Sequence, residues 1–397
     1  MKKYNITFDE VITYDNYYKA LKSCNKDVNY KYSVQNYDIH CAENITDTIR
    51  FIQDGGIPKV KDVNPVVIYE RGKRRIITPI DIRDRITQKV LCDNVLMPSI
   101  APHLIYDNGA SMEGKGTEFA RRRVEGFIED AKRKYNIDDL YVLVFDFKSY
   151  FDSIPHSQCY RVLDEYIADE RLKRLTIGII ESYKFHDVKK ITDPEEKRIQ
   201  IERIHNHEGI GICLGSQISQ IMAVAVPNRF DHLIKDKYRM KYYERYMDDG
   251  VIISNSKTQL LELMEILSAE AEKYGLHFNK KKTRVVKMTR GFTFLKVKYG
   301  IDSDGKTTKQ LVRSGIVRER RKMKSLAERI EQGKANQDDA YNNTQSWIGH
   351  SKVAKSYKTV KTMLRLYDDK FDGYKITRKY FRKHPEEGKR KRKVVRL

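Results

Sequence analysis

The pattern of hydrophobic and polar positions divides the chain into segments of different character. Residues 1–60 combine short stretches of helical periodicity with polar turns. Residues 66–69 and 75–78 are two β-rich runs joined by a tip that carries basic residues, which predicts a hairpin. Residues 84–96 then show the spacing of apolar positions that is typical of a helix. From residue 317 to the end the pattern is basic and mostly helical.

Strand patterns in the middle of the chain run into acidic residues. Residues 140–147 (LYVLVFDF) are branched and aromatic and lead to Asp146. Residues 242–254 (YYERYMDDGVIIS) predict two short strands that meet at an acidic turn. Residues 259–274 have the pattern of an amphipathic helix, and residues 291–299 alternate like a hairpin strand. Strands that alternate with helices, followed by a helical tail, predict an α+β fold with appended subdomains.

Composition narrows the class of protein. Of the 397 residues, 40% are hydrophobic and 33% are charged, which is typical of a globular chain rather than a disordered one. No apolar run approaches the roughly 18–20 residues that cross a bilayer, and no apolar segment follows the basic N-terminus. We therefore expect a cytoplasmic protein without a signal peptide or membrane contact. The five scattered cysteines argue against a disulfide framework or a zinc site.

An excess of basic residues predicts a polyanionic partner. The chain holds 77 Lys and Arg against 55 Asp and Glu, a net charge of +22. A protein this basic usually binds nucleic acid. The charge is uneven, because residues 388–397 (GKRKRKVVRL) contain six basic residues and no acid. We expect that tail to be a nonspecific RNA-binding arm.

The candidate chemistry rests on aspartates at two strand ends, Asp146 and the pair Asp248–Asp249. Neighbouring carboxylates at a turn between apolar strands repel each other unless a cation lies between them. Oxygen ligands without nearby Cys or His favour Mg²⁺ over a transition metal. Phosphoryl transfer uses two such ions roughly 3.5–4 Å apart: one activates the attacking hydroxyl, and the other binds the triphosphate and the leaving pyrophosphate.

Taken in order, these motifs resemble those of bacterial reverse transcriptases, from about residue 66 to residue 294 and weakly to residue 364. The resemblance implies a right-hand polymerase fold with fingers, a palm with an antiparallel sheet, and a helical thumb. The expected parts are an N-terminal extension at 1–60, fingers at 61–140, a palm at 141–300 with an inserted fingers segment at about 165–205, and a thumb with a basic tail at 301–397.

The resemblance also implies roles for the acidic residues. Asp146, Asp248 and Asp249 would be catalytic, and Asp146, Phe147 and Asp248 would form the site for two Mg²⁺ ions, with Mn²⁺ as a substitute. Phe151, five residues after Asp146, would be a steric gate whose ring stands where a ribose 2′-hydroxyl would lie, so that the site selects dNTPs.

Further motif residues are expected to contact the substrates. Lys73 and Arg75 would clamp the triphosphate as a point charge and a planar fork, and Lys282, in GLHFNKKKT, would lie near the triphosphate as a proton donor. The expected nucleotide-binding set is Lys73, Arg75, Phe151, Gln220 and Lys282. The expected template- and primer-binding set is Gly215, Ser219, Lys115, Phe294 and Leu295, with Lys296 where the family usually has glycine.

The predicted function is RNA-directed DNA synthesis that extends a DNA or RNA primer with dNTPs on an RNA template. Leu214-Gly215 followed by Ser219-Gln220, where many retroviral and intron enzymes have QG and SP, resembles diversity-generating retroelement and abortive-infection enzymes, as does the SWIGH segment at Trp347. Partners would then include a dedicated noncoding RNA, an accessory protein or a second copy of the chain. Two alternatives stay open: a template-independent or protein-primed nucleotidyltransferase, for which 26 tyrosines offer hydroxyls, and a noncatalytic RNA-binding protein.

Overall fold

A computed structural model describes residues 3–26, 28–58, 66–70, 73–77, 79–182, 194–195, 197–198, 202, 209–354 and 356–371; for residues 66–70 and 73–77 it describes the backbone only. The chain divides into two compact units, which are described separately. The first comprises Met1–Phe127 and Leu143–Val285, and the second Ile128–Val142 and Val286–Leu397. Most of the hairpin tip, part of the predicted fingers insert and the basic tail fall outside the described residues.

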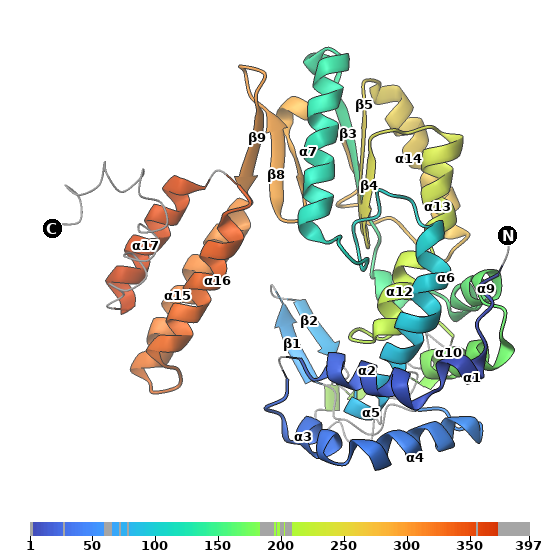
Figure 1. The fold of residues 1–397 in the computed structure, drawn as a ribbon. Coiled ribbons are helices and arrows are strands. Elements are labelled where there is room, and N and C mark those ends of the chain that lie inside the picture. The colour runs from blue at the N-terminus through green and yellow to red at the C-terminus, as the bar shows by residue number, and fades with distance from the viewer. Residues whose placement is uncertain are drawn as a thin grey trace. The chain divides into compact units, whose positions relative to one another are not determined.

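Short capped helices form the N-terminal part of the first unit, as the sequence predicts. They are α1 (Phe8–Val11), α2 (Tyr14–Cys24), α3 (Tyr32–Ile39) and α4 (Cys41–Gln53). Thr7 and Thr13 cap α1 and α2, which satisfies backbone N–H groups at the helix starts. Buried Tyr17, Leu21 and Ile45 help to form the core where α2–α4 gather around α5 (Ile82–Leu91) (Figure 1).

The predicted hairpin and the helix after it are both present. Strands β1 (Val66–Glu70) and β2 (Lys73–Ile77) pair antiparallel. Helix α5 begins two residues before the predicted start at 84, because Asp81 accepts a hydrogen bond from the backbone N–H of Arg83 and acts as the N-cap. The helical path then continues through η1 (Cys92–Leu96), α6 (Met97–Ile100) and η2 (Ala101–His103), and α7 (Thr117–Lys134) follows.

A four-stranded sheet in the order β4-β5-β3-β6 places the acidic strand ends side by side. The strands are β3 (Tyr141–Asp146), β4 (Tyr243–Tyr246), β5 (Asp249–Ser254) and β6 (Arg284–Lys287). Strands β4 and β5 form an antiparallel hairpin closed by the pair Tyr246 and Asp249. Because β3 is the other neighbour of β5, Asp146 at the end of β3 comes next to the start of β5.

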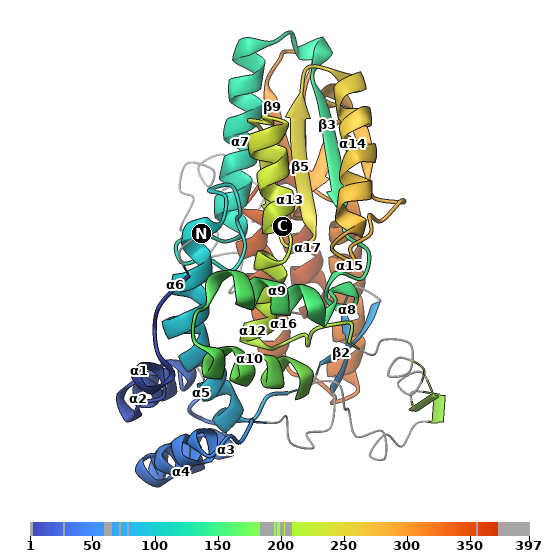
Figure 2. The same ribbon diagram turned by 90° about the vertical axis from the view of Figure 1, so that its right-hand side faces the viewer.

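Helices and aromatic rings support this sheet. Helices α13 (Asn228–His232) and α14 (Lys257–Glu272) lie alongside β5 (Figure 2). The Phe145 ring contacts the rings of Phe147, Phe230 and Phe278. A Cβ on Gly250 would stand 2.0 Å from the Phe145 ring, so only glycine fits directly after the acidic pair.

The first unit contains further helices. They are α8 (Tyr150–Ser153), α9 (His156–Tyr166), α10 (Glu170–Ser182), α12 (Gln217–Ala225) and η5 (Leu233–Lys237). Helix α14 starts at Lys257 rather than at the predicted residue 259, because Ser256 caps it through the N–H of Gln259.

The second unit combines a small sheet with a helical bundle. Short η3 (Ile137–Asp139) and η6 (Met288–Arg290) precede strands β7 (Phe292–Phe294), β8 (Val297–Ile301) and β9 (Thr307–Leu311), which pair antiparallel in that order. Helices α15 (Arg313–Glu331), α16 (Gln337–Ser351) and α17 (Tyr357–Phe371) form the bundle around buried Met323, Trp347 and Leu364 (Figure 1). Trp347 is therefore a core residue of this unit.

The strand predicted at residues 291–299 is a complete tight hairpin. Leu295 and Lys296 form its two-residue turn, and both have positive φ, 45° and 68°. Two-residue hairpin turns of this kind usually contain Asn-Gly or Asp-Gly. The turn is thus as tight as one with glycine in place of Lys296, although its backbone is strained.

No helix among the described residues is both long and apolar enough to cross a bilayer.

A buried carboxyl lies on the first strand of the acidic hairpin. Glu244 on β4 is 0% exposed, and neither carboxyl oxygen has a hydrogen-bond partner. Burial, followed by the charge of Asp107, raises the pKa of Glu244 to about 9, even though Arg123, Lys115 and Lys235 act in the opposite direction. Glu244 is therefore neutral at physiological pH.

Glu244→Gln should remove a pH-dependent loss of stability. Because the folded-state pKa is raised, the proton on Glu244 stabilises the fold fully below about 4.5, and this stabilisation is lost as pH rises through about 9. Between about pH 4.5 and pH 9, we expect the free energy of unfolding of the variant to rise relative to that of the wild type by up to about 1.4 kcal/mol per pH unit. Urea unfolding at pH 5.5 and pH 8 measures the gain, with the exposed Glu113→Gln as control. Parallel changes in all three proteins would contradict the assignment.

Candidate active site

Three carboxylates converge where β3, β4 and β5 meet. Asp146 is the last residue of β3 and is buried, and Asp249 is the first residue of β5. Asp248 is the second residue of the two-residue turn between β4 and β5. The backbone N–H of Phe147 donates to the carbonyl of Asp248 over 3.1 Å, which fixes the turn against the end of β3. The structure thus brings together the three residues that the sequence predicts to be catalytic.

The electrostatics of this cluster show the cost of gathering three acids. Burial raises the pKa of Asp249 to about 7, and the charges of Asp248 and Asp146 add to the rise. Lys282 acts in the opposite direction. At neutral pH Asp249 is therefore divided between its protonated and ionised forms.

Residues 279–283 form several polar contacts with Asp146. The Lys282 ammonium forms an ion pair with Oδ2 of Asp146, and the amide of Asn279 donates to Oδ1 over 3.2 Å. The backbone N–H of Asn279 also donates to the Asp146 carbonyl over 2.7 Å. Burial lowers the pKa of Lys282, but the hydrogen bond and charge of Asp146 outweigh it, and the pKa is raised overall. Lys282 is thus a fixed positive charge beside the acids.

The donor set fits a hard divalent cation. Among the described side chains, three carboxylates face one ammonium, so the cluster has an excess of negative charge and oxygen donors, which Mg²⁺ prefers. Within the described part of the chain, no three acidic, His or Cys side chains already surround a common point. Binding therefore requires the carboxylates of Asp146 and Asp248 to turn toward the ion. Phe147 is buried among aromatic rings, so only its backbone carbonyl could take part.

The glycine-containing segment before α12 forms a rigid turn. Gly215 is exposed and has φ of 106°, a conformation that favours glycine. Ser216 caps α12, and its hydroxyl donates to Oε1 of Gln88 over 3.0 Å. Ser219 is only 1% exposed, so the accessible part of this turn is the backbone at Gly215. Gln220 is half-buried on α12.

Sequence reasoning missed two kinds of residue here. Gln88 on α5 is buried and also accepts from the backbone N–H of Gln217, so it holds the turn from another element. The sequence gives no signal for this contact, because the partners are about 130 positions apart. Asn279 and Thr283 do stand in the recognised motif, and Asp146 donates its N–H to the Thr283 hydroxyl over 3.4 Å.

The remaining predicted site residues come from other elements of the fold. Phe151 on α8 is half-buried and packs edge-on against Tyr150. Lys115 donates to the carbonyl of Tyr106 and lies over its ring. Lys73 and Arg75 are on β2, but their side chains are outside the described structure. In the second unit, Phe294 is buried at the end of β7, and Leu295 forms the strained turn after it.

Cation binding to the acidic cluster should depend on pH around 7. A cation competes with the proton of Asp249, so we expect its affinity to rise from pH 6 to pH 8 by up to about tenfold per pH unit below the pKa of about 7. Calorimetric titration with Mg²⁺ in buffers of different ionisation enthalpy measures affinity and proton release together. Asp249→Asn should flatten the dependence. Equal affinity at both pH values without proton release would contradict the prediction.

Comparison with known proteins identifies the family. Residues 57–299 match the model of the reverse transcriptase (RNA-dependent DNA polymerase) family. No curated protein matches the chain significantly.

Solved telomerase structures show a loose likeness. One from Candida albicans, in complex with a fragment of telomeric RNA, is 15% identical with a TM-score of 0.42, covering 66% of this chain and 50% of its own. Two apo structures from Candida tropicalis, one of them lacking the C-terminal domain, are also 15% identical. Their TM-scores are 0.40 and 0.39, with 71% and 68% of this chain covered and 54% and 60% of theirs. The chain therefore spans about half to three-fifths of their length.

The family match covers more than half of the chain and includes both acidic strand ends. It confirms the expected fold class, an α+β right-hand polymerase fold, together with the observed antiparallel sheets and helices. The protein belongs to the reverse transcriptase family, the RNA-dependent DNA polymerases, which are nucleotidyltransferases.

Proposed function

We propose that this chain extends a primer with dNTPs on an RNA template by two-metal phosphoryl transfer. The observation that carries the proposal is the convergence of Asp146, Asp248 and Asp249 at adjacent strand ends, with Lys282 beside them. Reverse transcriptases generally use divalent metal ions and bind an RNA template and a primer. The proposed ions are two Mg²⁺, for which Mn²⁺ substitutes.

The residues of the cluster have different proposed roles. Bound Mg²⁺ ions supply activation of the primer 3′-hydroxyl and neutralise charge on the triphosphate. Asp146 and Asp248 would hold the ions, and Asp249 would add negative charge in its ionised form. The Lys282 ammonium, which is paired with Asp146, would lie near the triphosphate and would donate a proton to the leaving pyrophosphate.

Other residues select and align the substrates. Phe151 is the proposed gate against ribonucleotides, and Lys73 and Arg75 the proposed triphosphate clamp. The exposed backbone at Gly215, held in place through Ser216 and Gln88, is the surface on which the base pair being formed can lie. Contacts with the template and primer by Lys115, Phe294 and Leu295 stay proposals of the same kind.

For the biological role we propose a bacterial retroelement or an antiphage defence system. The support is the resemblance of the segments at Gly215 and Trp347 to diversity-generating and abortive-infection enzymes. A dedicated noncoding RNA would then be the template, and an accessory protein or a second copy of the chain would complete the complex. Neighbouring genes distinguish the two settings: a variable-repeat target in one, a conserved RNA in the other.

Purified protein should incorporate dNTPs on a primed RNA template when Mg²⁺ is present. Asp248→Ala should lower the rate on the order of 10³-fold or more, because a metal ligand is lost. Radiolabelled incorporation is measured with and without template RNA. Incorporation that needs Asp248 but survives RNA removal would establish the template-independent transferase instead. No incorporation in any sample would favour the noncatalytic RNA-binding reading.

Phe151→Ala should admit ribonucleotides, because the ring that excludes the 2′-hydroxyl is gone. We expect discrimination between dNTPs and rNTPs, measured as the ratio of kcat/KM, to fall by roughly 10- to 100-fold. Phe151→Tyr keeps the ring and is the matched control. Unchanged discrimination in the alanine variant would show that Phe151 only packs against Tyr150.

A further inference from the structure

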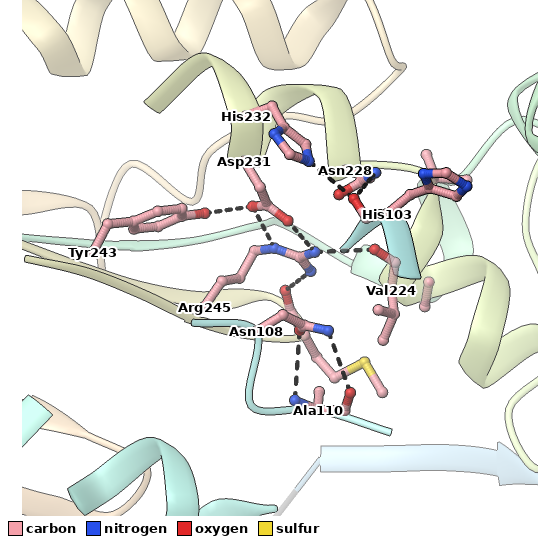
Figure 3. Close-up of polar contacts among 12 residues, drawn as sticks. His103, Asn108, Ala110, Val224, Asn228, Asp231, His232, Tyr243 and Arg245 are labelled. Atoms are coloured by element: carbon pink, nitrogen blue, oxygen red, sulfur yellow. Dashed lines mark hydrogen bonds and ion pairs between the residues drawn. The ribbon is translucent and has the colours of Figure 1, made fainter. Parts of the chain in front are cut away.

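A fully buried ion pair lies directly beneath the acidic turn. Arg245 on β4 and Asp231 on α13 both have side chains that are 0% exposed. The guanidinium donates from Nε to Oδ1 of Asp231 over 2.7 Å and from Nη2 to Oδ2 over 2.6 Å (Figure 3). Two parallel bonds of this kind fix the guanidinium in one plane.

Neighbouring groups remove the remaining freedom of this pair. The Tyr243 hydroxyl donates to Oδ1 of Asp231 over 2.6 Å, and Nη2 of Arg245 also donates to the carbonyl of Val224 over 3.0 Å (Figure 3). The backbone of Arg245 pairs with the loop before α7, because its N–H donates to Asp107 and its carbonyl accepts from Gly109. The arginine is therefore held at its backbone and at its guanidinium.

The free side of the guanidinium reaches the turn itself. Nη1 of Arg245 donates to the carbonyl of Met247 over 3.1 Å. Met247 is the first residue of the two-residue turn and has φ of 53°, in the left-handed region that side chains other than glycine rarely adopt. The carbonyl that Arg245 binds belongs to the peptide that leads into Asp248. A fixed charge thus holds a strained peptide next to a candidate metal ligand.

Burying a charged pair is costly and is weak evidence for stability by itself, since apolar residues of similar size often serve equally well. The third contact, to the Met247 carbonyl, is what an apolar replacement could not make. The charge of the pair therefore serves the contact with the turn rather than packing in the core.

We propose that Arg245, oriented by Asp231, is a positioning residue that fixes the Met247 peptide in its left-handed conformation and so sets the orientation of Asp248 for metal binding. The inference rests on the proposed function, because it takes Asp248 as a metal ligand. It assigns to Asp231 and Tyr243 the task of orienting the guanidinium.

The test is a pair of substitutions on the two sides of this contact. Arg245→Lys keeps the charge but cannot bind Asp231 and the Met247 carbonyl together. We expect the Mg²⁺ concentration for half-maximal dNTP incorporation to rise about tenfold, with a smaller change in KM for dNTP. Adding Met247→Gly should restore part of the shift, because glycine adopts positive φ without strain. Mn²⁺ binding, followed by electron paramagnetic resonance, should show the same order among the variants.

Controls separate positioning from folding. Lys173 is another buried cation, paired with Asp164 and Glu170 on α9 and α10, so Lys173→Met should lower thermal stability without changing the Mg²⁺ requirement. If Arg245→Lys does not fold, Tyr243→Phe removes only the hydroxyl that orients Asp231, and a two- to threefold rise, roughly, is then expected. An unchanged Mg²⁺ requirement in the folded variants, or no rescue by Met247→Gly, would overturn the proposal. If the wild type incorporates no dNTP, the proposed function fails, while Mn²⁺ binding still decides the role of Arg245.

Discussion

Mutual repulsion among three carboxylates at one end of a sheet is the constraint on which the rest of the first unit depends. Asp146, Asp248 and Asp249 come from two neighbouring strands and one turn, so strand pairing sets how close their backbones lie. The fold holds them from two sides. Lys282 and its motif neighbours clasp Asp146, while Arg245 holds the turn from the interior. Gly250 lets the strands lie close over the aromatic rings beneath.

Among the described residues of this unit, two carboxyl groups have raised pKa values, and only Asp249 lies in the candidate active site. Asp249 and Glu244 are both dominated by burial, but their surroundings differ. The second-largest contributions to Asp249 come from other acids at the same strand ends, which a cation would relieve. Glu244 instead lies among cations and one acid, away from those strand ends, and its oxygens have no partners. The candidate site is therefore marked by the gathering of three acids at one place, and not by the raised pKa alone.

Much of the local structure could be predicted from the sequence, whereas the supports of the site could not. Alternating patterns predicted the strands that end at Asp146 and at the acidic pair, since periodicity is a local property. Helix starts were wrong by two residues at α5 and α14 because a capping side chain, not the apolar pattern, sets the first turn. The contacts of Gln88 and Arg245 join distant elements, and no spacing in a single sequence reports them. The motif that contains Ser219 was recognised in the sequence, but the burial of the Ser219 side chain was not predicted.

Two hairpins in this chain close with two-residue turns that contain no glycine, although both turns include residues with positive φ. Met247 has positive φ in one, and Leu295 with Lys296 in the other. Glycine would adopt these conformations at less cost, but it would also leave the peptide free to adopt others. A bulkier residue limits the alternatives, provided that strand pairing and side-chain contacts supply the energy that the strain requires. At Met247 the hydrogen bond from Arg245 is one such contact, so the strain is better understood as part of how the turn is fixed than as a defect of its sequence.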